Sequence, residues 1–480
     1  MFRRSPWIAT ADARRAVQQL HFLRIAGTDC ARDVSLRQPQ ATAGSLSTIC
    51  RICRRHGASV GNLVCGDLSG YVIIQSESKP VSASPATYLW RSVRESARSV
   101  SQRPKRVFGL DLVRTIAIGL VIASHYGILL PAWRGIPPHY SVAVLGMLGV
   151  DLFFTLSGFL IGRLLIDIVR IAPSLANLRI FLIRRWMRTV PLYVVWLCIS
   201  VAFFPPADHR LRYFLEYISF TQNLAWPMPP SNWFGVSWSL TIEEWFYLLF
   251  GTCAIGYAIR RRTPQSMLLP LSLFCIVPAV LRWMVPDTAN WGDNIVGVVV
   301  MRLDSIGYGV ALAWLRFANP RLFDRPVICA TIGSGIVVGA WACLSTAGWI
   351  FPSHLFRTFV LSVADVGFIL CIIGATAWTT SHGLIARVVG KTSDISYGLY
   401  MMHLTILLAG GSWLIYGYWR AIAGIVIVTI SLALLSWHCF ESPILGLRPR
   451  QTFASRDVGT ADSDGSRTLD EADAEPVLSA

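Results

Sequence analysis

The chain alternates between long apolar runs and short polar loops from residue 103 onward. About 20 apolar residues at ~1.5 Å each match a hydrocarbon core of roughly 30 Å, so these runs predict helices that cross a bilayer. The predicted spans are residues 110–131, 141–169, 190–204, 234–258, 267–285, 295–315, 327–348, 357–379, 395–415 and 421–440. The third span is short, and residues 213–224 are interpreted as a re-entrant or interfacial piece rather than a span.

Basic residues are distributed unevenly between the loops on the two sides of these spans. Nineteen Lys and Arg residues fall on one side and six on the other. Cytoplasmic loops carry the excess of Lys and Arg, so we expect both termini to be cytoplasmic. The sequence therefore predicts an all-α, polytopic membrane protein with about ten transmembrane helices.

The two ends of the chain differ from the middle. Residues 1–102 contain no apolar run of spanning length and carry fourteen Lys and Arg against six Asp and Glu. This composition predicts a disordered extension, or upstream sequence included through a mistaken start codon. Residues 451–480 carry seven Asp and Glu against two Arg, which predicts an acidic, disordered cytoplasmic tail. Residues 103–450 are left as the membrane domain.

The composition excludes a soluble protein, because 54% of the 480 residues are hydrophobic and 15% are charged. The net charge of +16 is typical of nucleic-acid binding, but the arginines lie in short loops as topology signals, and no nucleic-acid partner is expected. The cysteines of the apolar runs show no paired spacing and are interpreted as small buried hydrophobic residues. They are Cys198, Cys253, Cys275, Cys329, Cys343, Cys371 and Cys439.

Four residues of the leader have a partial zinc-ligand pattern. Cys50 and Cys53 have the Cys-x2-Cys spacing, with His56 and Cys65 following. The second half of the pattern is irregular, so we expect no metal site.

The first span carries polar residues where a lipid-facing helix would have none. Arg114 and His125 are eleven residues apart, which returns to nearly the same helical angle, so both project from one face, roughly 16 Å apart. A charge at mid-bilayer costs roughly 3 kcal/mol, so such residues are functional candidates. A structural interpretation stays open: Arg114 can snorkel or pair with Asp111, and His125 can be a satisfied buried histidine.

Further polar residues lie in the later spans. Asp151 and Ser157 need partners inside the bundle or line a cavity, whereas Gly158 and Gly162 form a small-xxx-small pair that favours close helix packing. Glu243 and Glu244 point about 100° apart, so only one of them is expected to face the interior. The remaining buried polar groups can form ion pairs that hold the bundle together, and are Arg302, Asp304 and His403.

Two loops offer binding surfaces. Arg184, Arg185 and Arg188 form a basic cluster that anchors the cytoplasmic face, and their planar guanidinium groups also suit the phosphates of a nucleotide-bearing donor. Trp233 and Trp238 belong to a long outer loop and its junction with the next span. They form an interfacial belt or offer flat apolar faces to a sugar ring.

Residues 106–450 resemble the membrane acyltransferase type 3 family. LDLVRTIAIGLVIASHY resembles the opening helix of that family, in which the Arg and His are separated by ten residues as Arg114 and His125 are here. Further family patterns follow in the same order as GVDLFFTLSGFLI, RRWMRTVPLY, WSLTIEEWFYL, RLDSIGYGVALAW, ISYGLYMMHL and FESP.

This resemblance implies a multi-pass enzyme of the bacterial inner membrane. It implies transfer of an acyl group, often acetyl, from cytoplasmic acyl-CoA as co-substrate to a hydroxyl of an extracytoplasmic or lipid-linked glycan, with no bound cofactor. Arg114 and His125 match the family's essential pair, and Glu243 matches its recurrent glutamate. Acyl transfer to an alcohol needs a base, and a neutral His125 suits that role.

Two other classes of function remain open at this point. Polar residues in spans also form the substrate paths of secondary transporters, although no inverted repeat is evident in the sequence. A non-enzymatic scaffold for glycan assembly is the second alternative, but it gives no reason for a histidine and a glutamate inside spans.

Overall fold

Helices make up every regular element in the part of the chain that the structure, a computed structural model, describes. The described residues are 106–203, 210–227, 234–261, 263–347 and 353–449, and all belong to one unit of the chain. The predicted leader and tail, including Cys50, Cys53, His56 and Cys65, lie outside them.

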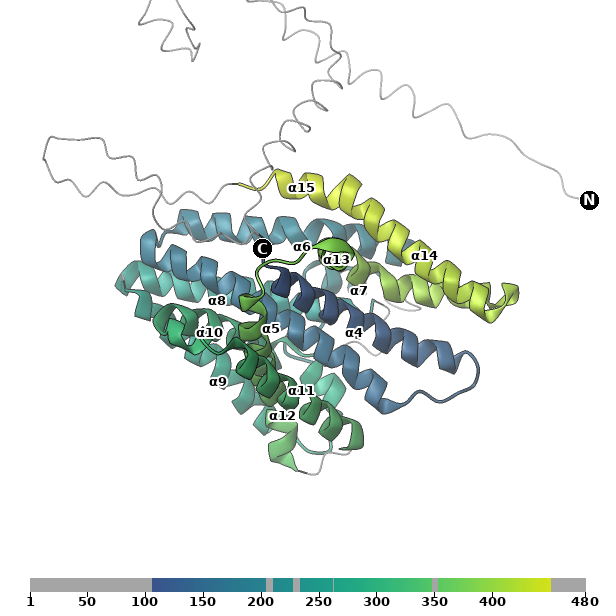
Figure 1. Ribbon diagram of the computed structural model, residues 1–480, viewed down its shortest axis with the longest axis horizontal. Helices are drawn as coiled ribbons and strands as arrows, with labels where there is room; N and C mark the ends of the chain where they lie inside the picture. Colours follow the sequence, from purple (N-terminus) through teal and green to yellow (C-terminus); the bar gives the residue numbers. More distant parts are fainter. Residues whose placement is uncertain (1–105, 204–209, 228–233, 262, 348–352, 450–480) are drawn as a thin grey trace, which may run out of the picture. The chain divides into compact units, whose positions relative to one another are not determined.

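The α-helices are α4 (Phe108–Ala132), α5 (Tyr140–Ile171), α6 (Leu175–Phe203), α7 (Arg210–Ile218), α8 (Ser237–Arg261), α9 (Leu268–Met284), α10 (Leu303–Ala318), α11 (Pro326–Ala347), α12 (His354–Ala377), α13 (Gly383–Gly410), α14 (Tyr418–Ser436) and α15 (Ser442–Gly446) (Figure 1). Short 3-10 or π turns join them: η1 (Pro264–Met267), η2 (Gly292–Val296), η3 (Val299–Met301), η4 (Pro320–Phe323), η5 (Gly411–Tyr416) and η6 (Trp437–Glu441).

Each of the ten predicted spans corresponds to a helix, and the predicted fold class is confirmed. Among the described residues, eight helices or helix-turn units are long and apolar enough to cross a membrane on that criterion alone. The other two are α8, which carries Glu243, Glu244 and basic residues at its end, and α10, which has only 16 residues. The nine-residue α7 is too short to span, as expected for the interfacial piece.

The third span is longer than predicted. Hydropathy predicts residues 190–204, but α6 begins at Leu175 and continues through Pro191 to Phe203. The predicted boundary is wrong because the arginines before Pro191 lower the local hydropathy without interrupting the helix. Leu, Met and Arg are good helix formers, so the basic stretch is one continuous helix with the apolar stretch.

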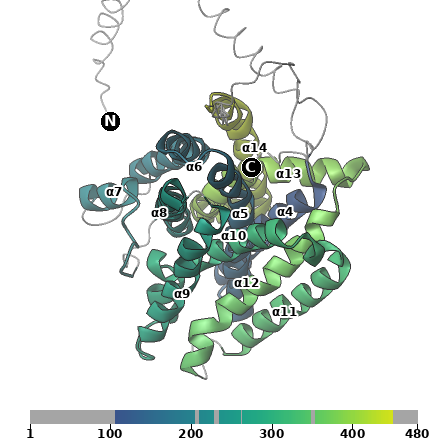
Figure 2. The same cartoon turned by 90° about the vertical axis from the view of Figure 1, so that its left-hand side faces the viewer.

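Helix α5 is the central element of the bundle. It contacts α4, α8, α10, α11 and α12, and Figure 2 shows these helices around it. The outer helices instead keep apolar side chains on their exposed faces. On α9 these side chains are Leu269, Leu273, Ile276, Val280 and Trp283, which follow a helical period. Such a continuous exposed apolar stripe suits contact with lipid.

Glycines allow α5 and α10 to cross in backbone contact. A Cβ atom on Gly158 would lie 2.0 Å from the carbonyl oxygen of Ile306, and one on Gly309 would lie 2.1 Å from that of Thr155. Gly162 also faces α10, at Ala313. The packing interpretation of Gly158 and Gly162 is therefore confirmed.

Two buried ion pairs connect the helices around this crossing. Arg282 on α9 donates to both carboxylate oxygens of Asp304 on α10, at 2.9 and 2.7 Å. Arg302, which directly precedes α10, pairs with Asp151 on α5, and all four side chains are at most 1% exposed. Removing one partner of such a pair costs about 3–5 kcal/mol, so these pairs hold the helices together.

The cysteines differ from expectation. None of those in the apolar helices is buried within the described protein: Cys198, Cys253, Cys343 and Cys439 are exposed, and the other three are intermediate. Apolar sequence does not distinguish a residue that faces the bundle from one that faces lipid, which explains the error.

We expect Gly158→Ala to lower the thermal stability of the purified protein, because its methyl group would overlap the Ile306 carbonyl. Overpacking of this kind costs about 1–3 kcal/mol. Gly119→Ala on α4 is the matched control, since nothing lies within 4 Å of the position that its Cβ would take. Melting temperatures in detergent test the pair, and an unchanged value for Gly158→Ala would contradict the close crossing.

We also expect the α8–α9 loop to be cytoplasmic and the segment after α7 to be outside, because of the uneven distribution of basic residues. The test is labelling of Thr263→Cys and Ala225→Cys, both exposed positions, in a background without native cysteines. An impermeant thiol reagent applied to intact cells should label only Ala225→Cys. Labelling of Thr263→Cys would overturn the predicted orientation.

Candidate functional site

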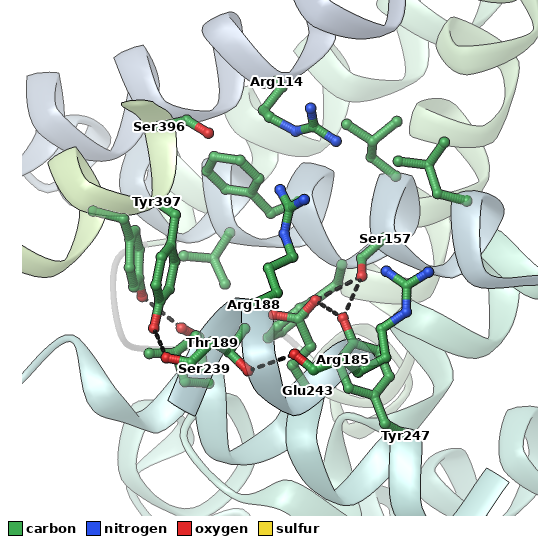
Figure 3. A pocket seen from close by; sticks show the side chains of 17 residues that line it. Arg114, Ser157, Arg185, Arg188, Thr189, Ser239, Glu243, Tyr247, Ser396 and Tyr397 are labelled. Atoms are coloured by element: carbon green, nitrogen blue, oxygen red, sulfur yellow. Dashed lines mark hydrogen bonds between the residues drawn. The ribbon is translucent and has the colours of Figure 1, made fainter. Parts of the chain in front are cut away.

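A pocket lies among α4, α5, α6, α8 and α13, and its empty space of about 780 Å³ includes a part that is open to solvent. Its polar lining comes from side chains of all five helices, as Figure 3 shows. They are Arg114, Ser157, Arg185, Arg188, Thr189, Ser239, Glu243, Tyr247, Ser396, Tyr397 and Tyr400. The apolar lining comes mainly from α5, including Phe153 and Phe154. A large apolar pocket with a few convergent polar groups is the usual form of a ligand site.

Glu243 is the carboxyl group in the pocket lining. Ser157 donates to its Oε1 at 2.6 Å, and Tyr247 donates to the same atom from one turn further along α8. The neighbouring Glu244 instead accepts from Thr189 and does not line the pocket. The expectation that only one of the two glutamates faces the interior is wrong, because Glu244 is 5% exposed and Glu243 lines the pocket.

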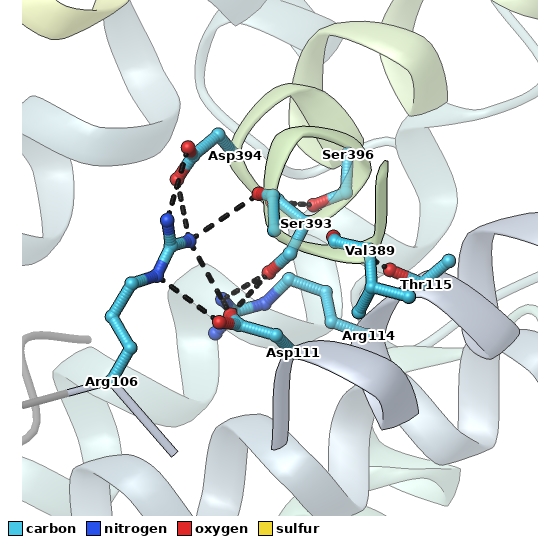
Figure 4. Close-up of polar contacts among 9 residues, drawn as sticks. Arg106, Asp111, Arg114, Thr115, Val389, Ser393, Asp394 and Ser396 are labelled. Carbon is cyan, nitrogen blue, oxygen red and sulfur yellow. Dashed lines mark hydrogen bonds and ion pairs between the residues drawn. The ribbon is translucent and has the colours of Figure 1, made fainter. Parts of the chain in front are cut away.

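Arg114 reaches the pocket from α4. Its Nη1 donates to Ser393 on α13 at 3.2 Å, whereas its distance to Asp111 is 3.9 Å, the limit for an ion pair. Asp111 is held more closely by Arg106 at 3.1 Å and by the Ser393 hydroxyl at 2.7 Å (Figure 4). Asp111 therefore compensates Arg114 only weakly, which leaves the guanidinium available to a ligand.

The basic cluster of α6 divides into two parts. Arg185 and Arg188 line the pocket, whereas Arg184 donates to the carbonyl oxygen of Pro449 at 2.7 Å. Arg185 is 7% exposed, and its buried Nε has no hydrogen-bond partner among the described residues. Its guanidinium lies over the rings of Phe181 and Tyr247, at 5.9 and 5.8 Å.

A further arginine approaches this cluster from the end of the described chain. Burial, followed by repulsion from Arg188, Arg185 and Arg184, lowers the pKa of Arg448 to about 9. Arg448 is therefore close enough to these three arginines of α6 for their charges to repel its own. This concentration of positive charge favours an anionic ligand.

His125 lies on α4 beyond Arg114 and is outside the pocket lining. Its Nδ1 is 3.0 Å from Nε2 of His403 on α13. The His403 ring is in turn 6.0 Å from the ring of Tyr400, which lines the pocket. The histidine pair is thus next to the pocket, on the side of Tyr400.

The sequence predicts that Ser157 finds a partner in the bundle or lines a cavity, but sequence reasoning missed the other hydroxyl groups of the pocket. Tyr397 donates to the Thr189 carbonyl at 2.6 Å, and Tyr400 donates to that of Val236 at 3.0 Å. Aromatic residues in apolar spans give no signal beyond packing. Ser396, Tyr400 and His403 follow the i, i+4, i+7 spacing, which would have placed them on one face of α13.

The other predicted binding residues lie elsewhere. Asp151 is fully buried in its pair with Arg302, and Trp238 packs edge-on against Phe154, so neither lines the pocket. Trp233 lies outside the described residues. Within the described ranges, no three His, Cys, Asp or Glu side chains come together as they would around a metal ion.

A family model and two curated relatives all identify acyltransferases as the proteins that this chain resembles. A family model described as an acyltransferase domain matches residues 107–438. The peptidoglycan O-acetyltransferase OatA of Listeria monocytogenes is 26% identical over 72% of this chain and 57% of its own length. The O-acetyltransferase OatA of Staphylococcus aureus is 25% identical over 71% of this chain and 57% of its own length.

A third relative is similar to this chain over nearly the whole of its own length. Nodulation protein 10 of Rhizobium leguminosarum is 25% identical over 70% of this chain and 93% of its own length. The chain therefore spans little more than half of the two OatA proteins but most of the nodulation protein. No solved structure matches the chain.

Proposed function

The chain belongs to the acyltransferase type 3 family, and from this premise we propose that it transfers an acyl group, acetyl in the first place, from acyl-CoA to a hydroxyl group of an extracytoplasmic or lipid-linked carbohydrate. The observation that carries the proposal is a pocket in which three guanidinium groups face one carboxyl group, next to a histidine pair. We propose the bacterial inner membrane as its location, with the basic end of the bundle cytoplasmic.

The donor is assigned from the charge of the pocket. Arg114, Arg185 and Arg188 outnumber Glu243, and a buried excess of positive charge is costly until an anion binds. Phosphate groups fit the planar guanidinium donors of arginine. The phosphates of CoA would therefore bind near Arg185 and Arg188, and Arg448 adds to the attraction.

The length of the donor fits the distance to the base. Arg114 and His125 are eleven residues apart on α4, which is roughly 16 Å along the helix. Arg114 lines the same pocket as Arg185 and Arg188, and CoA carries its thioester at the end of a long arm, so phosphates held in this pocket would leave the acyl group free to reach His125. A small donor such as acetyl phosphate would not bridge the two ends.

His125 is the proposed base. It takes the proton of the acceptor hydroxyl while the oxygen attacks the thioester carbonyl, and the tetrahedral intermediate then expels CoA as a thiolate. The proton held by His125 returns to that thiolate, so the ester and free CoA are formed and the enzyme is unchanged. Glu243, fixed by Ser157 and Tyr247, is proposed to orient the donor in the pocket.

The carbohydrate acceptor is proposed from the relatives. The name of the Listeria protein gives peptidoglycan as its acceptor. A sugar hydroxyl would reach His125 from the outer half of the bundle, where the partly exposed His125 ring lies according to the predicted topology. Trp233 and Trp238 remain predicted contacts of that acceptor.

We expect His125→Ala to abolish transfer from labelled acetyl-CoA while the protein still inserts, because loss of a general base costs about 10²- to 10⁴-fold in rate. Arg114→Ala and Glu243→Ala should each reduce transfer severely. The measurement is transfer to cell-envelope carbohydrate per folded molecule, alongside the melting temperature.

His382→Ala is the matched control for His125→Ala, because His382 is exposed at the start of α13 and makes no capping hydrogen bond. A His125→Ala protein that keeps near-parental transfer would show that His125 is structural. Absence of any thioester hydrolysis or transfer by the parent would instead favour a transporter or a scaffold.

The arginines of α6 give a sharper test of the donor. We expect Arg185→Gln and Arg188→Gln to raise the KM for acetyl-CoA about tenfold or more, since a hydrogen bond to a charged group contributes about 1.5–3 kcal/mol. Arg184→Gln is the control, because Arg184 binds the Pro449 carbonyl instead of lining the pocket. Equal effects of Arg184→Gln and Arg185→Gln would argue against donor phosphates in the pocket.

A further inference from the structure

The partner of His125 is a second histidine on a different helix. Nδ1 of His125 and Nε2 of His403 are 3.0 Å apart, and the ring centroids are 5.0 Å apart with an interplanar angle of 46°. Two imidazoles at this distance share one hydrogen, so the donor and the acceptor must be identified from their other contacts.

The other ring nitrogen of His403 identifies its tautomer. Nδ1 of His403 lies 3.0 Å from the carbonyl oxygen of Leu399 and 2.8 Å from that of Tyr400. Carbonyl oxygens only accept hydrogen bonds, so Nδ1 carries the hydrogen.

The surroundings of His403 determine its charge. Its side chain is 0% exposed, and within the described chain its ring bonds to two carbonyl oxygens and His125, with no carboxylate among these partners. A doubly protonated ring here would be a buried cation without a counterion, which is strongly unfavourable. His403 is therefore neutral, with its lone pair on Nε2.

The tautomer of His125 follows from that of His403. An unprotonated Nε2 on His403 can only accept, so the hydrogen between the rings belongs to Nδ1 of His125. In a neutral imidazole with Nδ1 protonated, the lone pair of His125 is on Nε2.

We propose that His403 is a positioning residue that fixes His125 in the Nδ1-protonated tautomer, so that Nε2 of His125 is the atom that takes the acceptor proton. This inference rests on the proposed function, in which His125 is the base. His403 is fully buried and His125 is partly exposed, so only His125 is accessible to a substrate.

The same contact changes in strength during the reaction. When Nε2 of His125 takes the hydroxyl proton, the ring becomes an imidazolium and its Nδ1–H becomes a charged donor to neutral His403. Charge-assisted hydrogen bonds are roughly twice as strong as neutral ones. His403 thus stabilises the protonated base, and no proton crosses between the rings.

The test compares two amides at position 403. The amide of His403→Gln extends as far as Nε2 of the native ring and offers an oxygen to His125. The shorter amide of His403→Asn can still donate to the Leu399 and Tyr400 carbonyls but leaves His125 without its acceptor.

We expect His403→Asn to lower kcat about 10²-fold or more with an unchanged KM for acetyl-CoA, and His403→Gln to recover most of that loss. Loss of the group that sets the tautomer of a catalytic histidine costs up to roughly 10⁴-fold in rate.

The outcomes separate this inference from the proposed function. If His125→Ala is inactive but His403→Asn keeps parental kcat, His403 does not position the base. Equal losses in both His403 variants, accompanied by equal drops in melting temperature, would also overturn it and show a structural role.

A spectroscopic measurement on the parent is independent of activity. Nitrogen-15 NMR of histidine-labelled protein, assigned by comparison with His125→Ala, should show His125 as the Nδ1–H tautomer at neutral pH. A His125 signal with the proton on Nε2 would overturn the inference even if His125 proved to be the base. If His125→Ala remained active, His125 would not be the base, while its tautomer could still be read.

Discussion

Charge inside an apolar bundle has to be compensated, and the structure depends on how this is achieved. Around the α5–α10 crossing, Arg302 meets Asp151 and Arg282 meets Asp304, each with almost no exposed surface. These pairs join helices α5, α9 and α10 at the point where glycines bring two backbones into contact. A single unpaired ion there would cost about 3–5 kcal/mol, and each of these two arginines bonds to a buried carboxylate.

The other half keeps its positive charges incompletely compensated. Asp111 is bound mainly by Arg106 and Ser393, so it compensates Arg114 only weakly, and Arg185 relies on aromatic rings and has an unsatisfied Nε. Buried guanidinium groups that lack a close carboxylate partner are candidates for binding an anion. The contrast between the two halves is the physical reason for assigning an anionic donor to the pocket rather than a purely structural role to its arginines.

Much of the fold could be predicted from the sequence, because hydropathy and length determine which segments form long apolar helices. The spacing of Arg114 and His125 also placed both on one face of α4, and Gly158 and Gly162 indicated a close crossing. The predictions that failed concern residues whose surroundings are determined by tertiary contacts. Arg184 and Arg185 are adjacent in sequence, yet one binds the Pro449 carbonyl and the other lines the pocket. Asp151 could equally have lined a cavity, and only its distant partner Arg302 shows why it does not.

Helices α4 and α13 connect the two ends of the proposed site. Arg114 contacts Ser393 and His125 contacts His403. The two contacts are eleven residues apart on α4 and ten residues apart on α13, so their separations along the two helices are nearly equal. Because the order of the contacts is the same on both, the helices run in the same direction, and each separation is roughly 15–16 Å. Ser396, Tyr397 and Tyr400 of α13 line the pocket between these two contacts. A shift of α13 against α4 by one turn would break both contacts together, so the same packing that positions Arg114 at the pocket also fixes the tautomer of His125.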